Sequence, residues 1–294
     1  MTINFVRRMA WTLLAVTSCV QAKPLVLSSI KPLTLIAQEI AGDSAAVDTL
    51  LPITASPHDY PLKVSDYTRL QKADVVLWVG PELESFLQKP LTNLSASRRI
   101  TAYELPGLHW PPDEPHEGGE HHHERDPHLW LDPRNAIVVA QALSEKLAQI
   151  DTTNKAIYAV NLQIFVAKMH TLDINLTEKL KPLAGRGFAV YHEGYGHFVN
   201  HYGLHQLDYV TFTPEQKPGA KHLHQLREVL LKEGSCLFLE PYYELQSARD
   251  LAQELNLQLG VLDALGSQNV SSYTQLLERM AEAFSHCLAH GSSE

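Results

Sequence analysis

The chain has 294 residues, with 24 Lys or Arg against 33 Asp or Glu, so its formal net charge at pH 7 is −9. An acidic chain of this kind argues against nucleic acid as a partner and attracts cations. Its length is enough to bury a full core, and such a length usually divides into two domains.

The first 22 residues have the pattern of a secretory signal peptide. Arg7 and Arg8 precede an apolar run of about a dozen residues, and the small residues of "VQA" come just before Lys23. The run is shorter than the roughly 20 residues that span a bilayer, so we expect cleavage and export rather than a membrane anchor. A second interpretation stays open, in which "VTSC" is a lipoprotein box and Cys19 is lipidated.

Short apolar runs alternate with helical patterns in the first half of the chain. Strands are predicted at Leu25–Ser29, near Leu50 and at Val75–Val79. Helices are predicted at Pro32–Ala41, from Ser65 as N-cap to Lys72, and from Pro81 onward. Alternation of this kind is typical of a parallel sheet with helices on both faces.

A long stretch without Gly or Pro joins the two halves. Its apolar residues recur at spacings of three and four from Thr153 to Lys181, which predicts a helix about 43 Å long at 1.5 Å per residue. Neither half needs a helix of that length internally, so we expect a rigid strut between two lobes. Two helices broken near His170 are the alternative.

The second half repeats the alternation of the first. Strands are predicted at Phe188–Tyr191, Cys236–Glu240 and Leu257–Asp263, and helices at Ala220–Lys232, Tyr243–Leu255 and Tyr273–Leu288. The expected fold is therefore α/β, with two similar lobes of mostly parallel sheet joined by one long helix. The expected division is 1–22 signal peptide, 23–151 N-terminal lobe with a His-rich loop at 113–125, 152–182 linking helix, and 183–294 C-terminal lobe.

Only two cysteines, Cys236 and Cys287, remain after the predicted cleavage site. In an exported protein such a pair predicts a structural disulfide. Two thiols without further cysteines also exclude a Cys-rich zinc site.

Four side chains of types that can bind a metal follow predicted strands or leave the sheet through a loop. His58 and His128 belong to the first half, and His192 and Asp263 end strands of the second half. Ligands of open α/β sheets bind at this edge, so one cleft between the lobes can gather all four. Any one of these histidines alone is more often a structural residue held by hydrogen bonds.

Four long motifs occur in order over essentially the whole mature chain: "SPHDYPLKVSDYTRLQKADVVLWVGPELESFLQKPL", "DPHLWLDP", "FAVYHEGYGHF" and "CLFLEPYY…LGVLDALG". They closely resemble the metal-binding proteins of bacterial ABC importers, and among them the high-affinity zinc-uptake proteins of the Gram-negative periplasm (ZnuA type). The resemblance implies that His58, His128 and His192 bind the metal and that Asp263 takes the fourth, carboxylate position. It also implies two α/β lobes bridged by a long helix.

The resemblance has one departure. Some zinc-binding relatives carry Glu immediately before the first histidine, where this chain has Pro57, so that ligand does not carry over. The fourth position is therefore Asp263, water or a mixture. Three imidazoles and one carboxylate suit Zn²⁺, whereas manganese-importing relatives use a carboxylate where His192 stands.

The remaining histidines of the densest stretch lie among Pro, Gly and Glu: His116, His121, His122 and His123. That composition buries no core and predicts a loop, for which we expect weak, exchangeable metal binding. The alternative is a solvated loop that binds nothing measurable.

A zinc-dependent hydrolase is the rival class, because "HEGYGH" invites comparison with the H-E-x-x-H motif. His192 and His197 are five residues apart, which places them on different faces of a helix. We therefore expect no catalytic step. The expected function is capture of Zn²⁺ and delivery to a membrane ABC permease by a periplasmic monomer, with auxiliary zinc chaperones as further candidate partners; a manganese or other divalent-metal carrier is the alternative.

Overall fold

The computed structural model describes residues 22–112, 125–241, 243, 245–266 and 269–290. The predicted signal peptide up to residue 21, with Cys19, lies outside the described residues. So do the loop histidines His116, His121, His122 and His123. Across the described ranges, no helix combines the length and the apolarity that crossing a membrane requires.

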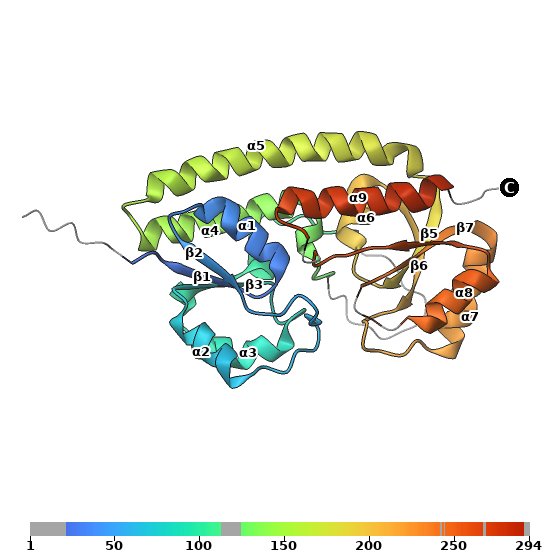
Figure 1. Ribbon diagram of the computed structural model, residues 1–294, viewed down its shortest axis with the longest axis horizontal. Helices are drawn as coiled ribbons and strands as arrows, with labels where there is room; N and C mark the ends of the chain where they lie inside the picture. The colour runs from blue at the N-terminus through green and yellow to red at the C-terminus, as the bar shows by residue number, and fades with distance from the viewer. Residues whose placement is uncertain (1–21, 113–124, 242, 244, 267–268, 291–294) are drawn as a thin grey trace, which may run out of the picture.

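The first lobe is built on a parallel sheet of order β2-β1-β3-β4. Its strands are β1 (Leu25–Ser28), β2 (Ala46–Thr49), β3 (Val75–Trp78) and β4 (Arg99–Thr101). One face is covered by α1 (Lys31–Ala41) and α4 (Pro133–Ile150), and the other by α2 (Val64–Lys72) and α3 (Ser85–Thr92), as Figure 1 shows. The four buried residues of β3 fit a strand covered on both faces.

The second lobe repeats this design with a parallel sheet of order β6-β5-β7-β8. Its strands are β5 (Gly187–His192), β6 (His205–Thr211), β7 (Gly234–Leu239) and β8 (Gln258–Val261). Its helices are α6 (Gly196–Tyr202), α7 (Ala220–Glu233), α8 (Gln246–Glu254) and α9 (Tyr273–His290). Short 3₁₀ helices occur at Ala96–Arg98, Ala102–Glu104, Leu129–Leu131 (η3) and Lys181–Leu183. The predicted fold class is confirmed.

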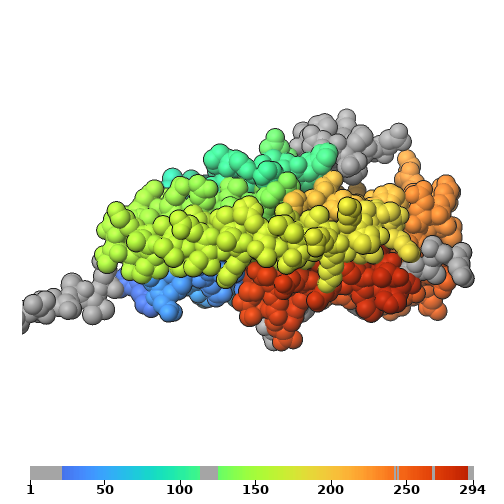
Figure 2. Space-filling model, turned by 90° about the horizontal axis from the view of Figure 1, so that it is seen from above, coloured from blue at the N-terminus to red at the C-terminus, as the bar shows by residue number. Residues whose placement is uncertain are grey.

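Helix α5 (Lys155–Leu180) runs without a break along the length of the molecule and packs on α4 and α9 (Figures 1 and 2). The predicted linking helix is thus confirmed, and the alternative of a break near His170 is wrong. Its buried residues recur at helical spacing: Tyr158, Phe165, Met169, Leu172, Leu176 and Leu180. Because this buried face continues across both lobes, α5 ties them together along one side.

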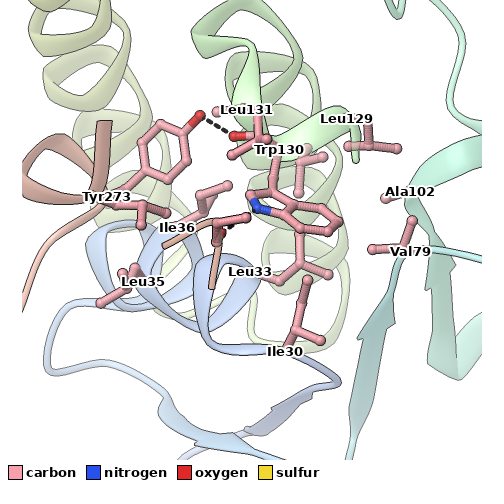
Figure 3. Packing of buried hydrophobic residues seen from close by; sticks show 14 of the residues in the cluster. Ile30, Leu33, Leu35, Ile36, Val79, Ala102, Leu129, Trp130, Leu131 and Tyr273 are labelled. Atoms are coloured by element: carbon pink, nitrogen blue, oxygen red, sulfur yellow. Dashed lines mark hydrogen bonds between the residues drawn. The ribbon is translucent and has the colours of Figure 1, made fainter. Parts of the chain in front are cut away.

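The two lobes also share one apolar core. A single cluster of buried side chains extends from Val26 in β1 to Leu288 in α9. Trp130, which is fully buried, lies at the junction of the lobes (Figure 3). Its Nε1 donates to the backbone carbonyl of Ala264 at 2.8 Å. The hydroxyl of Tyr273 donates to the backbone carbonyl of Trp130 at 2.6 Å. Truncation of a buried Trp costs about 3–5 kcal/mol, so this junction is a substantial part of the stability.

Helix α2 begins two residues earlier than predicted, at Val64 rather than at Asp66. Ser65 is not its N-cap, because the helix starts at Val64 and Lys63 occupies the cap position. The carboxylate of Asp66 accepts the N–H of Lys63 at 2.9 Å. The side chain that caps this helix is therefore an acid at the third helical position, which accepts the N–H of the N-cap residue, and not a serine hydroxyl at the N-cap.

Two other predicted helix starts are wrong. Helix α3 begins at Ser85 rather than at Pro81, because the carbonyl of Gly80 accepts two N–H groups in a turn that precedes the helix. Helix α8 begins at Gln246 rather than at Tyr243.

Four elements were not predicted: β4, α4, α6 and β6. Strand β4 has three residues and α6 has seven, too short for a periodic pattern. Helix α4 did carry a start signal, since the carboxylate of Asp132 accepts the N–H of Arg134 at 2.8 Å and Pro133 takes the first helical position.

The predicted disulfide is confirmed. Cys236 on β7 and Cys287 on α9 are bonded, with their Cα atoms 6.2 Å apart. The bond closes a loop of 51 residues and fastens α9 to the second sheet.

Candidate metal site

Three predicted ligands meet in a cleft between the lobes. His58 lies in the loop between β2 and α2, His128 directly precedes η3, and His192 is the last residue of β5. The side chains of His128 and His192 are only 3% and 5% exposed. Residues from three separate segments, drawn from both halves of the chain, thus line the same cavity of about 470 Å³.

The three rings are spaced for a shared ion. Their centroids are 5.3 Å (His58–His128), 5.6 Å (His58–His192) and 5.1 Å (His128–His192) apart. One ligand nitrogen of each ring lies within 4.8 Å of the other two. The Nε2 atoms of His128 and His192 are 3.3 Å apart, and two nitrogens bound tetrahedrally to one Zn²⁺ at 2.0–2.1 Å are separated by about 3.3 Å.

Local structure explains how two of these rings are placed. His192 ends β5, whose neighbours β6 and β7 fix it on either side. His128 is the residue before η3, and Trp130 two residues later is anchored to the second lobe. His58 follows the buried Pro57 in a loop, where its own N–H donates to the Ser56 hydroxyl at 3.1 Å.

Carboxylates fix the orientation of two of the rings. The Nδ1 of His128 donates to Asp126 at 2.7 Å, and the Nδ1 of His192 donates to Glu240, whose side chain is 8% exposed. The hydroxyl of Tyr195 also donates to Glu240, at 2.9 Å. With each Nδ1 protonated in this way, the Nε2 lone pair of each ring faces the cleft.

Neither carboxylate was among the predicted site residues, although signals for both exist. Asp126 is two residues before His128, and Glu240 follows β7, which lies beside the strand that carries His192.

The electrostatics keep the rings neutral to different degrees. Burial, together with the neighbouring imidazoles, lowers the pKa of His58 to about 2. Burial also lowers the pKa of His128, against the opposing effect of Asp126. For His192 burial acts downward too, but Glu240 outweighs it and raises the pKa. The carboxylate of Asp126, although buried, has its pKa lowered by His128. A metal needs neutral imidazoles, so burial favours metal binding at His58 and His128, whereas a proton competes with the metal at His192.

Asp263 lies in the wall of the same cavity, two residues beyond the end of β8. Its Oδ1 accepts the N–H of Gly266 at 2.8 Å, and its charge acts on Lys31 of the first lobe. Within the described part of the chain, the group whose ligand atoms converge consists of the three histidines and does not include this carboxylate. Its role as a fourth ligand stays a prediction.

Gly194 lies against the ligand atoms. A Cβ built on it would be 2.3 Å from the Nε2 of His192 and 3.0 Å from the Cε1 of His128. Any side chain at this position would therefore enter the space beside the two facing nitrogens.

The arrangement around Glu193 does not resemble a metalloprotease site. Its carboxylate accepts a hydrogen bond from Gln206 on β6 at 3.0 Å, and the residue does not line the cavity. Burial raises its pKa to about 7. His197 contacts Asn135 at 3.3 Å and donates to the carbonyl of Asp126 at 2.9 Å, so it supports the site from outside the ligand cluster.

Fold and site together define a class of protein: two parallel-sheet lobes, joined by a long helix, with a three-histidine candidate metal site in the cleft. The family model described as "Zinc-uptake complex component A periplasmic" matches residues 26–287. The chain belongs to this family.

Individual relatives agree with that assignment. The high-affinity zinc uptake system protein ZnuA of Yersinia pestis is 36% identical over 292 residues, which cover 91% of this chain and 92% of the relative. The protein of the same name from Haemophilus ducreyi is 33% identical, covering 94% and 96%. Among solved structures, a ZnuA deletion mutant with zinc bound is similar at a TM-score of 0.79 and 25% identity, covering 93% of this chain and all of that one.

Proposed function

We propose that this chain captures Zn²⁺ in the inter-lobe cleft and delivers it to a membrane ABC permease for import. His58, His128 and His192 supply the imidazole ligands. The names of its relatives, which are zinc uptake proteins, support the metal and the role.

One observation carries the proposal. Two buried Nε2 atoms, each on a ring whose Nδ1 donates to a carboxylate, face each other at 3.3 Å. Two lone pairs at that distance repel each other, and a cation between them converts the repulsion into coordination. A third imidazole within 4.8 Å completes a ligand set for one ion.

The donor set favours zinc over manganese. Imidazole is a borderline ligand that suits Zn²⁺, whereas Mn²⁺ prefers oxygen donors. For the fourth position we propose Asp263 or a water molecule, in exchange with the contact that Asp263 makes to Gly266. Pro57 offers no side-chain ligand at the position where some relatives have Glu.

Carriage rather than catalysis fits the surroundings of the metal. Glu193, the one acid of the "HEGYGH" stretch, accepts a hydrogen bond from Gln206 and is not among the residues that line the cavity of the three histidines. We propose that the chain performs no reaction, acts as a monomer, and works in the periplasm after removal of residues 1–22. Lipidation at Cys19 is the alternative to clean removal of this segment. Auxiliary zinc chaperones are further candidate partners.

The loop histidines have a secondary role in this proposal. His116 and His121 to His123 bind zinc weakly and exchange it, and deletion of residues 114–124 removes only those weak sites. We also propose the domain division of the carrier: an N-terminal lobe at 23–151, a linking helix at 152–182 and a C-terminal lobe at 183–294.

The test is competition between the metal-free protein and a chromophoric zinc chelator, with metal content checked by mass spectrometry. We expect one tight Zn²⁺ per chain, weaker Mn²⁺ binding, and severe loss of the tight site in His58→Ala, His128→Ala and His192→Ala. Loss of the tight site on deleting 114–124 would contradict the ligand assignment. Hydrolysis of peptide or ester substrates that Glu193→Gln abolishes would defeat the carrier proposal.

A further inference from the structure

The three rings of the site are held unequally. Asp126 fixes His128 from the first lobe, and Glu240 fixes His192 from the second. Within the described residues, no hydrogen bond reaches either ring nitrogen of His58, and its Nε2 is buried without a partner. Two ligands are therefore oriented before a metal arrives, and one is not.

The backbone repeats the same asymmetry. His192 belongs to a strand paired on both sides, and η3 after His128 is pinned by Trp130 to the second lobe. His58 lies in the loop that runs from the end of β2 to the start of α2 at Val64. Loops move more readily than the elements that flank them. The side chain that lacks a positioning partner is thus also the one on the most adaptable segment.

We propose that metal binding in this cleft is ordered: His128 and His192, with Asp126 and Glu240 as their positioning residues, receive the ion first, and His58 joins last and leaves first. The inference rests on the proposed function. It assigns roles to the two carboxylates and names the His58 loop as the release point.

The proposal follows from tautomer chemistry. A neutral histidine carries its proton on one ring nitrogen only, and metal binding through Nε2 requires the proton on Nδ1. A carboxylate that accepts from Nδ1 holds this form, so each of the two rings, when neutral, presents its Nε2 lone pair to the cleft. Without the carboxylate the competent fraction falls, and the observed affinity falls with it.

The kinetics of metal exchange test the order. Zn²⁺ association and chelator-driven dissociation are followed by stopped flow for the wild-type chain and for Asp126→Asn, Glu240→Gln and His58→Ala. We expect the two amide variants to weaken zinc binding by about 10–100-fold, mainly through slower association. We expect His58→Ala to accelerate dissociation with little change in association.

A matched control and a second readout separate positioning from general damage. Asp173 accepts a hydrogen bond from His201 outside the cleft at 2.5 Å, so Asp173→Asn makes the same chemical change away from the metal. It should leave zinc kinetics unchanged. Nitrogen-15 NMR of the metal-free protein, recorded at a pH where the His192 ring is neutral, should show it protonated on Nδ1 in the wild type and as a tautomer mixture in Glu240→Gln. Thermal unfolding of each metal-free variant checks that it is folded.

The outcomes are distinct. Folded amide variants that bind zinc with wild-type rates would overturn the positioning roles, and slow association in His58→Ala with unchanged dissociation would overturn the order. Either result leaves the carrier function standing if the wild-type chain still binds one tight zinc. Absence of tight zinc binding by the wild-type chain would instead defeat the proposed function.

Discussion

Replacing Gly194 by Ala tests the geometry of the site with a single methyl group. The added Cβ would lie 2.3 Å from the Nε2 of His192, and real Cβ contacts essentially never come below 3.0 Å. The His192 ring would have to move by at least about 0.7 Å, whereas metal–ligand distances tolerate about 0.2 Å. His192 cannot move freely, because its Nδ1 is bonded to Glu240.

The expected cost is larger for metal binding than for folding. Displacing a ligand should cost at least as much as the 10–100-fold seen on changing an outer partner, so zinc affinity should fall by about 100-fold or more, or about 2.7 kcal/mol. Gly194 is not among the glycines with a positive φ, so alanine fits its backbone. The methyl group would still press on the buried His192 ring, and overpacking of this kind costs about 1–3 kcal/mol, so the metal-free chain should lose about that much unfolding free energy and stay folded.

Chelator competition measures the affinity, and urea denaturation of the metal-free protein measures stability. Gly185→Ala is the matched control, since nothing lies within 4 Å of its Cβ position and its φ is not positive. A folded Gly194→Ala variant with wild-type zinc affinity would refute the reasoning, because it would mean that the ion does not occupy the space beside His192.

Three further predictions concern pH and stability. Because the pKa of His192 is raised and that of His58 is about 2, we expect a single proton, on His192, to compete with each zinc ion. Zinc affinity should then fall about tenfold per pH unit between pH 7 and pH 5. Calorimetry that shows two or three protons released per zinc ion would contradict this. Buried Glu84 has its pKa raised from 4.5 to about 7, so its protonated form stabilises the fold, and this contribution is lost as pH rises through that range. Glu84→Gln should therefore gain roughly 2–3 kcal/mol of unfolding free energy over wild type between pH 5 and pH 8, measured by urea denaturation; a constant difference would refute it. Replacing Cys236 and Cys287 by Ser should cost about 4 kcal/mol of unfolding free energy while one zinc per chain still binds, and loss of zinc from the folded variant would be the contrary result.

The pattern of the chain predicts the architecture well. Strands such as Val75–Trp78 are continuously apolar and bounded by turns, and α5 has neither Gly nor Pro over 26 residues. These signals are local, so they can be read from a single sequence. Helix starts were less accurate, because a cap can come from a side chain inside the helix, as with Asp66.

The convergence of the three histidines was predictable from the sequence, but the groups that hold their rings were not. His192 and Asp263 follow strands, and position along a strand is visible in the sequence. That Glu240 holds His192 depends on β7 lying beside β5, and strand order is not visible in a single sequence. The packing of Gly194 against the rings depends in turn on the backbone path after β5, which no local pattern specifies.

The shared core under α5 has a consequence for transport. With side chains of both lobes interlocked in one cluster, a filled and an empty carrier should have nearly the same outline. A transporter that meets a mixture of the two cannot tell them apart by overall shape. We expect it to sense the cargo locally instead, through the loop from residue 50 to residue 63, which brings His58 to the wall of the cavity.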